Sequence, residues 1–294
     1  MRVFITGGTG FIGSAVVREL IDAGHAVTGL ARSEKAAATL VAAGAEVLPG
    51  SLEDLDSLRR GAAAGEGVIQ LAFNNDFVDF VAAGAAELRA VDTIGTALEG
   101  SSKPFVIASG TLRVAALGRV ATEEDQGQKE SPRGASEDAV IALAERRIRS
   151  STVRLAPCVH DARRQGLATR LVELARLKGV SAYIGDGMNR WPAVHRLDAA
   201  HLFRLALESA PAGVRLHAAA EPGIPFRDIA EAIGRNLKLP VVGLSPAEAE
   251  KHFGWFAQVV SLDNPTSSTL TRELLGWHPA QPSLISDIDR YFKA

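Results

Sequence analysis

The chain of 294 residues contains one cysteine, Cys158. A single cysteine cannot form an internal disulfide, and it cannot supply the several thiolates of a cysteine-based zinc site. The sequence also lacks a block of lysines or arginines, since 32 basic and 34 acidic residues give a formal net charge of −2. Nucleic acids and anionic membranes are bound by basic surfaces, so we expect neither of these partners. A small organic molecule is the expected partner.

Long apolar runs are also absent. No stretch reaches the about 18 uninterrupted apolar residues of a membrane helix, and the start MRVFITGGTG lacks the pattern of a secretory signal. The sequence contains no G-x-S-x-G hydrolase elbow and no G-x-x-x-x-G-K-[ST] phosphate loop. His195 and His201 do not share a helical face, so no metal site is expected. The 47% of hydrophobic residues fits a large core, and we expect a reducing, cytoplasmic location.

The first half of the sequence alternates short apolar runs with helix-length segments. This alternation is typical of parallel strands joined by crossover helices, and it predicts an α/β protein with a Rossmann-type doubly wound sheet. The expected strands are 2–6, 26–31, 45–50, 67–72, 104–109 and 151–156, and the expected helices are 14–23, 35–43, 55–64, 77–99 and 134–150.

Beyond about Ala156 the alternation gives way to isolated helical segments and loops rich in Gly, Pro and Asn. We therefore expect a dinucleotide-binding domain over 1–156 and mainly a smaller substrate-side lobe over 157–294, with some elements interleaved. Helices are expected in this lobe at 165–178, 198–209, 225–237 and 246–253.

The stretch TGGTGFIG, residues 6–13, lies where the first strand turns into the first helix. Gly7, Gly10 and Gly13 have the spacing G-x-x-G-x-x-G, and glycines at this point permit a tight turn and let a diphosphate approach the backbone amides. The helix N-terminus adds N–H donors and the positive end of its dipole. The stretch predicts a dinucleotide site that also includes Phe11 and Ile12.

The end of the second strand, GLARSEK, indicates which dinucleotide binds. An NAD site usually has Asp or Glu at this position, whereas Arg32 and Ser33 stand here. A guanidinium can pair with a 2′-phosphate through two hydrogen bonds, and the hydroxyl can add a third. NADP(H) is the predicted cofactor and NAD(H) the alternative. The other interpretation is a solvated loop in which Arg32 and Lys35 face water.

The chain resembles the short-chain dehydrogenase/reductase superfamily, in its extended NAD-dependent epimerase/dehydratase and dihydroflavonol-reductase-like branch. The resemblance spans nearly the whole chain through the motifs TGGTGFIG, GAEVLPGSLEDLDSL, VIASGT, SPRGASEDAVIALAE, VRLAPCV, AVHRLDAA and LLGWHP. The family pattern usually has Asp where Ser51 stands. The resemblance implies further cofactor contacts: Leu52 near the adenine, Leu71, Ala72 and Phe73 along the ribose, and Pro157, Cys158 and Val159 beside the nicotinamide.

The superfamily's catalytic tyrosine and lysine are both replaced. Matching SPRGASE to the usual SPYGASK puts Arg133 at the tyrosine position and Glu137 at the lysine position. Arg is a poor proton donor, and Glu carries the opposite charge to Lys. We expect the two residues to pair as i, i+4 neighbours on a helix surface, and Arg133 is also a candidate substrate contact.

Hydride transfer still requires an oriented substrate and a donor to the developing negative charge. Ser109 and Thr111 of ASGT are candidate donors, and Gly110 between them stands at the position of the family serine. The alternative for both hydroxyls is to satisfy backbone groups at the strand end. Tyr183 is a third candidate, because its segment resembles the one that faces substrate in the extended family.

The segment NRWPAVH resembles the part of extended family members that binds the polar group of the substrate. Arg190 can clamp an anion, Trp191 can form an apolar wall, and Asn189 completes the group. His195 is expected to join the substrate lobe to the nucleotide domain. The aromatic cluster HFGWF, residues 252–256, either caps an apolar pocket or anchors the core.

The leading hypothesis is an NADP(H)-dependent oxidoreductase that reduces a carbonyl-type or related C=N or C=C bond of a small organic substrate. One alternative is a nucleotide-sugar epimerase or dehydratase, and another is a non-catalytic NADP-sensing or regulatory binding protein. The resemblance also suggests a homodimer through the fourth and fifth helices. Its candidate contacts, which can equally be domain core, are Phe77, Val78, Phe80 and Val81.

Overall fold

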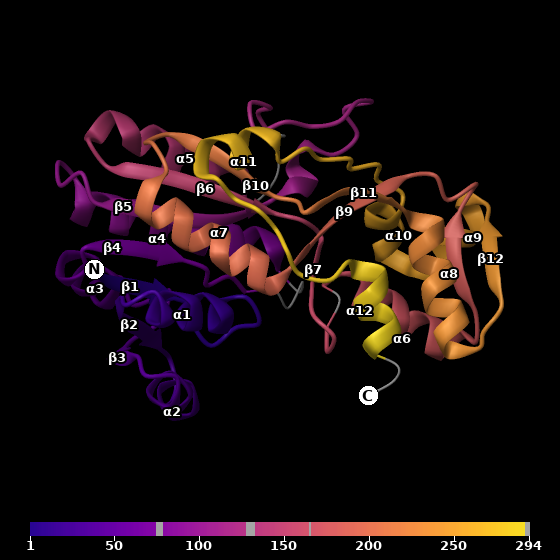
Figure 1. Ribbon diagram of the computed structural model, residues 1–294, viewed down its shortest axis with the longest axis horizontal. Coiled ribbons are helices and arrows are strands. Elements are labelled where there is room, and N and C mark those ends of the chain that lie inside the picture. The colour runs from indigo at the N-terminus through magenta and orange to yellow at the C-terminus, as the bar shows by residue number, and fades with distance from the viewer. Residues whose placement is uncertain (75–78, 128–132, 165, 292–294) are drawn as a thin grey trace.

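The computed structural model describes residues 1–74, 79–127, 133–164 and 166–291. Two lobes lie side by side along its longest axis, and the chain begins in the larger one (Figure 1). No described helix is long and apolar enough to cross a membrane.

The larger lobe is built on a seven-stranded sheet in the order β10-β6-β5-β4-β1-β2-β3, and all neighbouring strands are parallel. This order confirms the predicted Rossmann-type α/β fold and its first six strands. The strands are β1 (Arg2–Thr6), β2 (Ala26–Ala31), β3 (Glu46–Pro49), β4 (Gly67–Gln70), β5 (Pro104–Gly110), β6 (Arg149–Leu155) and β10 (Val214–Ala218).

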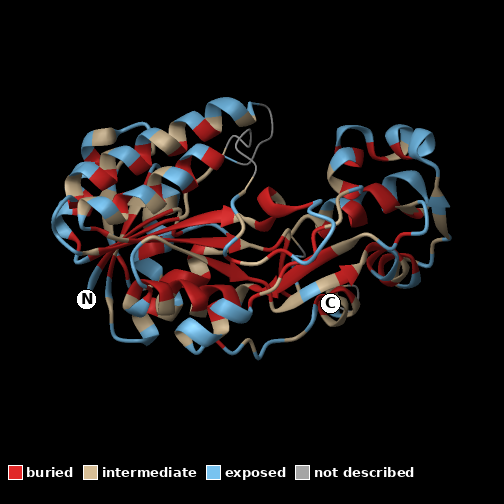
Figure 2. Ribbon diagram, turned by 90° about the horizontal axis from the view of Figure 1, so that it is seen from above, coloured by how far each residue is buried: buried red, intermediate tan, exposed pale blue. Residues whose placement is uncertain are grey.

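Helices cover both faces of the sheet, because successive strand residues point to opposite faces and both faces are apolar. Phe4 and Phe105 pack in the core beneath α3, α4 and α5, whereas Val3 and Val106 pack in the core beneath α1 and α7. Figure 2 shows the buried strands between these two helical layers. The helices are α1 (Gly13–Asp22), α2 (Glu34–Ala42), α3 (Leu55–Ala64), α4 (Phe80–Leu98), α5 (Gly134–Ala142) and α7 (Arg196–Ser209).

The predicted helix 134–150 is too long. Helix α5 ends at Ala142, a 3₁₀ turn η2 (Leu143–Arg146) follows, and Arg147 has a left-handed backbone with φ of 57°. The turn reverses the chain into β6, which starts at Arg149. The predicted helix 77–99 begins at Phe80 in the structure, and its first residue, Phe77, lies outside the described part of the chain.

The smaller lobe contains a three-stranded sheet in the order β11-β9-β7 and a two-stranded sheet of β8 and β12. The sequence did not indicate these strands, whereas the predicted helices at 198–209, 225–237 and 246–253 are present. The strands of this lobe are β7 (Cys158–His160), β8 (Ser181–Ile184), β9 (Arg190–His195), β11 (Glu221–Pro225) and β12 (Val241–Leu244). Its helices are α6 (Ala168–Lys178), α8 (Phe226–Leu237), α9 (Pro246–Phe253), η3 (Gly254–Phe256), α10 (Ala257–Val260) and α12 (Leu284–Tyr291). Helix α11 (Thr269–Leu275) lies against β10 and α7 of the larger lobe (Figure 1).

The chain passes between the lobes several times after residue 156. β10 and α7 belong to the larger lobe, although both follow elements of the smaller one. In the smaller lobe the HFGWF cluster is divided: Phe253 and Phe256 are buried in the core, and Trp255 is 58% exposed.

Candidate functional site

The glycine-rich loop joins β1 to α1 at the carboxyl edge of the large sheet. Gly7 has a φ of 71°, and a Cβ on it would lie 2.6 Å from the Ala72 nitrogen. A Cβ on Gly13 would lie 2.0 Å from the Gly7 carbonyl oxygen. The fold itself therefore requires glycine at both positions. A Cβ on Gly10 would meet only the Gly7 oxygen, at 3.3 Å, so Gly10 faces open space.

The start of α1 leaves three consecutive amides open. Among the described residues, the N–H groups of Phe11, Ile12 and Gly13 donate to no acceptor, while Gly10 donates to Gly7 at 3.0 Å. Unpaired amides at a helix N-terminus, together with the helix dipole, form a binding site for an anion. The loop thus fits the diphosphate of a dinucleotide.

Arg32 follows β2 at the same edge of the sheet. Its side chain is exposed and makes no ion pair or hydrogen bond with the described residues. Ser33 caps α2, where its Oγ accepts a hydrogen bond of 3.2 Å from the Ala36 amide. Arg32 is therefore available to a ligand, whereas the Ser33 oxygen is used by the helix.

The predicted adenine and ribose contacts follow the neighbouring strands. Leu52 is half-buried against the core beneath α3, and the Ser51 Oγ accepts from the amides of Glu53 and Asp54, which closes a turn. Leu71 and Ala72 follow β4, and their amides donate to the carbonyl and hydroxyl oxygens of Thr6. The contact between Ala72 and Gly7 places this segment beside the glycine loop.

Phe73, which follows Ala72 after β4, contacts Phe80 and Arg133. Its ring centroid lies 5.2 Å from that of Phe80, and the Arg133 guanidinium carbon lies 4.3 Å from the Phe73 ring centroid. Of the proposed dimer contacts, Val81 is 72% exposed, and Phe77 and Val78 lie outside the described residues.

The Pro157, Cys158 and Val159 segment leads from β6 into the smaller lobe. Val159 packs in the core and the Pro157 carbonyl accepts from the Leu167 amide at 3.1 Å. Cys158 has no exposed surface, and burial raises the pKa of its thiol to about 12. The thiolate that a nucleophile needs is thus absent near neutral pH.

The expected pairing of Arg133 with Glu137 is wrong. Arg133 stands at the start of α5 and donates through Nε and Nη2 to the buried Glu87 of α4, at 3.0 and 2.5 Å. Its Nη2 also donates to the Ala108 carbonyl at 2.6 Å. With one fifth of its side chain exposed, Arg133 links α4, α5 and β5.

Glu137 points from α5 to the sheet and is fully buried. Its carboxylate forms ion pairs with Arg154 at 2.6 Å, Arg215 at 3.1 Å and Arg113 at 3.2 Å. Burial alone would raise the pKa of this carboxyl, but the hydrogen bonds and charge of Arg154 and the charge of Arg113 hold it well below its usual range. The position of the family lysine therefore carries a permanent carboxylate inside an arginine cluster.

The sequence reasoning missed these arginines, although one signal was present. Arg154 lies inside the apolar strand STVRLA, and a charge in a buried strand requires a buried partner.

Ser109 and Thr111 flank the carboxyl end of β5. Ser109 is 2% exposed, its Oγ has no hydrogen-bond partner among the described residues, and it is near enough to Glu137 to help lower the pKa of that carboxyl. Thr111 is fully buried, and its Oγ1 accepts a 2.9 Å hydrogen bond from Asn264, which the sequence did not indicate. Gly110 is half-buried, and a Cβ on it would meet only the Leu155 oxygen, at 3.9 Å. The position where the family has its serine therefore has room for a Cβ atom.

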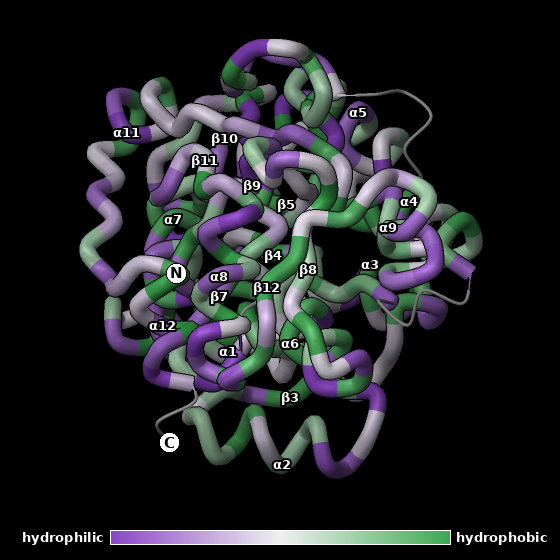
Figure 3. Tube along the Cα trace, turned by 90° about the vertical axis from the view of Figure 1, so that its right-hand side faces the viewer, coloured by the Kyte–Doolittle hydropathy of each residue, from purple (hydrophilic) through white to green (hydrophobic). Residues whose placement is uncertain are grey.

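The structure does not bring Tyr183 to these residues. Tyr183 lies in β8, which pairs with β12 at the far end of the smaller lobe (Figure 3). Its ring packs against Gly187 and Gly243, and the Arg227 guanidinium lies 5.6 Å from the ring centroid.

The three residues of NRW are held by contacts within the protein. The Asn189 side chain donates to the carbonyls of Val260 and Leu262, and Arg190 pairs with Asp263 through Nε and Nη2 at 3.0 and 2.8 Å. Trp191 has no exposed surface and packs edge-on against Phe226 and Phe256. These contacts give Asn189 and Trp191 structural roles, and they occupy the guanidinium of Arg190.

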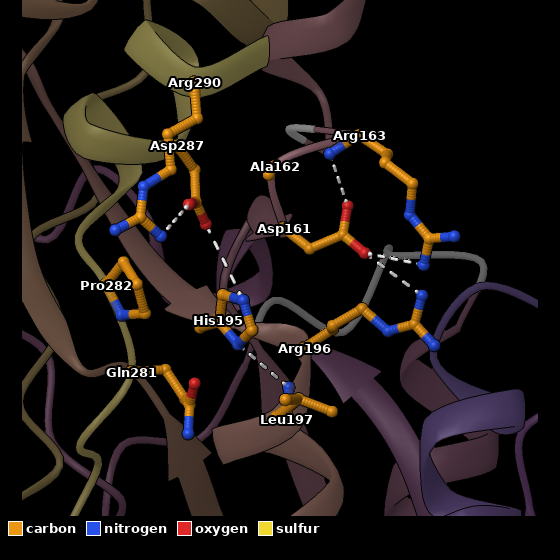
Figure 4. Close-up of a pocket in the computed structure, with 10 residues that line it drawn as sticks. All are labelled: Asp161, Ala162, Arg163, His195, Arg196, Leu197, Gln281, Pro282, Asp287 and Arg290. Carbon is orange, nitrogen blue, oxygen red and sulfur yellow. Dashed lines mark hydrogen bonds and ion pairs between the residues drawn. The ribbon is translucent and has the colours of Figure 1, made fainter. Parts of the chain in front are cut away.

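His195 belongs to a buried cluster where β7, β9 and α12 meet. Its Nδ1 accepts from the Leu197 amide at the start of α7, and its Nε2 lies 3.7 Å from Asp287. The Nδ1 of His160 lies 2.8 Å from the same carboxylate, and burial lowers the pKa of both histidines. A pocket of about 360 Å³ opens beside this cluster (Figure 4). None of the predicted cofactor or catalytic residues lines it.

These placements leave one edge of the large sheet suited to chemistry. The glycine loop, Arg32 and Phe73 follow parallel strands there, and Ser109 is one of the last two residues of β5. Ligands of such sheets bind outside the carboxyl ends of the strands. The described residues contain no group of His, Cys, Asp and Glu side chains that would hold a metal ion. The open amides of the glycine loop at this edge suit a dinucleotide.

Similarities to known proteins bear on the family and the fold of the chain. The sequence model of the NAD dependent epimerase/dehydratase family matches residues 3–218. An uncharacterized protein of Schizosaccharomyces pombe is 46% identical over 295 residues, which cover 99% of this chain and 100% of the relative. The 4-hydroxy-2-methyl-3-oxo-4-farnesyl-3,4-dihydroquinoline-1-oxide ketoreductase of Stigmatella aurantiaca is 30% identical over 123 residues, 42% of this chain and 34% of the relative. The structure of MoeE5 with UDP-glucose and NAD is similar in fold, with a TM-score of 0.77, 18% identity and coverage of 100% of this chain and 98% of that one.

Proposed function

Because the chain belongs to the NAD-dependent epimerase/dehydratase family, we propose that it is a reductase that uses NADP(H) to reduce a carbonyl or related double bond of a small organic substrate. The observation that carries the proposal is the presence of an open anion site and the Ser109 hydroxyl at one edge of the large sheet. The amides of Phe11, Ile12 and Gly13 and the exposed Arg32 suit the phosphates of the cofactor. The Ser109 Oγ stands at the same edge of the sheet, where its hydroxyl faces the Glu137 carboxylate closely enough to lower the pKa of that carboxyl.

When bound, the nicotinamide supplies the hydride that adds to the electrophilic carbon of the substrate. Ser109 would donate its hydroxyl hydrogen toward the oxygen or nitrogen that gains negative charge. The proton that completes the reduction comes from water, because Glu137 is ionised and Arg133 is a poor acid. The identity of the Stigmatella relative as a ketoreductase supports reduction of a ketone.

A non-catalytic NADP-dependent binding protein is the second candidate. This candidate is favoured because the residues at both catalytic positions of the family form ion pairs within the protein. Arg133 pairs with Glu87, and Glu137 pairs with three arginines. A nucleotide-sugar epimerase or dehydratase has less support, because such reactions need a base at a sugar hydroxyl and the described site provides neither Tyr nor Lys at that place.

The test is a calorimetric titration of the protein with NADPH and NADH, followed by NADPH oxidation with aldehydes, ketones, imines and enones. We expect tighter binding of NADPH and turnover of at least one substrate class. Tight binding without turnover over the whole panel would replace the reductase by the binding protein. Absence of binding to both dinucleotides would overturn both candidates.

A further inference from the structure

The turn at residues 161–164 of the smaller lobe reaches the glycine loop of the larger one. The Arg164 guanidinium carbon lies 5.5 Å from the Phe11 ring centroid, and the Arg196 guanidinium carbon lies 4.8 Å from the same centroid. We propose that Arg164 binds the diphosphate of the dinucleotide and thereby clamps the cofactor from the smaller lobe. The inference rests on the proposed function only in requiring a dinucleotide at the glycine loop.

Asp161 fixes the shape of this turn. Its Oδ1 accepts hydrogen bonds from the amides of Arg163 at 2.7 Å and Arg164 at 3.0 Å, and its backbone pairs with that of Arg164 in both directions. Its Oδ2 pairs with Arg163 at 3.3 Å and with Arg196 at 3.1 Å (Figure 4). The carboxylate of Asp161 thus holds the two neighbouring arginines and stiffens the turn that presents Arg164.

Arg164 differs from Arg163 and Arg196, because its guanidinium does not pair with Asp161. Arg196 donates to Ser14 at 3.2 Å as well as to Asp161, so its position on Phe11 is part of the fold. The Arg164 side chain is exposed, and within the described ranges it forms no ion pair or hydrogen bond. Its guanidinium instead lies against the Phe11 ring.

Contact with an aromatic ring leaves a guanidinium able to bind an anion. The ring attracts the cation through its π face, while the five N–H donors lie in the guanidinium plane and remain available for a phosphate. Phe11 positions this cation beside the loop, and its own amide is one of the three open donors at the start of α1. A diphosphate on those amides would therefore meet a second set of donors from Arg164.

The test compares three probes by isothermal titration calorimetry. NADPH carries both the diphosphate and the 2′-phosphate, ADP-ribose carries only the diphosphate, and 2′-AMP carries only the 2′-phosphate. In Arg164→Ala we expect NADPH and ADP-ribose to bind roughly tenfold more weakly, as loss of a charge-assisted hydrogen bond predicts, and 2′-AMP to bind as in the wild type. The matched control is Arg163→Ala, whose side chain is 80% exposed and pairs only with Asp161 in the described residues; all three affinities should stay unchanged.

The outcomes separate the clamp from the proposed function. If the wild type binds NADPH and Arg164→Ala binds each of the three probes as tightly as the wild type does, the clamp is overturned and the dinucleotide site stands. Equal weakening of 2′-AMP in Arg164→Ala would also overturn it, because the effect would then be structural. A wild type that binds neither NADPH nor ADP-ribose would overturn the clamp together with the proposed function. Arg164→Lys, which keeps the charge and loses the planar donors, should recover part of the lost affinity.

Discussion

Arg154 and Glu137 form an ion pair in which neither side chain has exposed surface, with Nη2 2.6 Å from Oε1. Arg113 and Arg215 complete the charges on the same carboxylate. Breaking one partner of a buried pair leaves an uncompensated charge, which is much more costly than loss of a surface pair. Glu137, at the position of the family lysine, therefore stabilises the fold through this cluster.

Glu137→Lys would put the family residue back at this position, and we expect it to destabilise the protein rather than to confer activity. The new ammonium would face three guanidinium groups without water, so the free energy of unfolding should fall by about 3–5 kcal/mol or more. Urea denaturation measures the change. Glu145→Lys is the control, because Glu145 lies in η2 directly after α5, is exposed and forms no ion pair with the described residues; it should cost less than about 1 kcal/mol. A Glu137→Lys protein of wild-type stability would contradict the structural role of the cluster.

His217 adds a pH dependence to the same cluster. Its Nδ1 lies 2.8 Å from the Ser267 carbonyl oxygen, and its Nε2 lies 3.3 Å from Arg154. A neutral ring satisfies both, donating from Nδ1 and accepting at Nε2. Burial, aided by the charge of Arg154 and opposed by Glu123, Ser267 and Glu137, lowers the pKa of His217 to about 4.

Between pH 6.5 and about 4 the unfolded chain binds this proton and the folded chain does not. The free energy of unfolding should therefore fall as the pH falls through that window, by up to roughly 1.4 kcal/mol per pH unit from this group. Above pH 6.5 the protonation of His217 does not change the free energy of unfolding, and below about pH 4 it causes no further decrease. Urea denaturation at several pH values should give a smaller slope for His217→Gln than for the wild type. An unchanged slope would mean that the pKa of His217 is the same in the folded and the unfolded chain.

Gly10 and Gly13 should separate cofactor binding from folding. We expect Gly10→Val to raise the Kd for NADPH by at least about tenfold, or 1.4 kcal/mol, because its side chain would enter the space of the diphosphate. Thermal stability should change little, since a Cβ at this position meets only the Gly7 oxygen at 3.3 Å. Gly13→Ala should instead lower thermal stability, because its Cβ would lie 2.0 Å from that oxygen. Retention of NADPH affinity by a folded Gly10→Val protein would contradict the phosphate site.

The fold was predictable from the sequence where the burial of a strand leaves an apolar run in its own residues. The central strands β1, β4 and β5 of the large sheet are buried on both faces, so they appear in the sequence as short apolar runs between helix-length segments. β8 and β12 have four residues each and mixed exposure, and β7 has three. Such short strands are defined by their partners elsewhere in the chain, so their own residues gave no comparable pattern.

The cofactor loop was predictable and the ion-pair partners were not. The glycines at positions 7 and 13 are local constraints, because a Cβ on either would collide with backbone a few residues away or just after the adjoining strand. The i, i+4 rule failed for Arg133 and Glu137 because the two side chains face different elements, α4 and β6. Glu87 is 46 residues from Arg133, and Arg154 is 17 residues from Glu137. Tertiary packing brings these partners together, and the helix period alone does not predict it.

Arg32 is the residue that should decide between the two dinucleotides. Arg32→Glu places a carboxylate where a 2′-phosphate would bind, so the affinity for NADPH should fall by at least about tenfold, while the affinity for NADH should change by less than a factor of about three. Calorimetric titrations of wild type and variant with both dinucleotides measure the ratio. Arg18→Glu is the control, because Arg18 lies in α1 with its side chain 70% exposed. Equal losses for NADPH and NADH in Arg32→Glu would show that this side chain does not read the 2′-phosphate.

Ser109 and Thr111 should behave differently when their hydroxyls are removed. Ser109→Ala should lower kcat for NADPH oxidation by roughly a hundredfold, the effect of losing one donor to a developing oxyanion, without changing the Kd for NADPH. Thr111→Val should instead lower the free energy of unfolding by about 1–3 kcal/mol, because the buried Asn264 amide would lose its acceptor. Steady-state kinetics and urea denaturation of both variants test the assignment. If Ser109→Ala keeps its kcat and Thr111→Val loses it, the donor is Thr111, and the substrate must reach a residue that is fully buried in this structure.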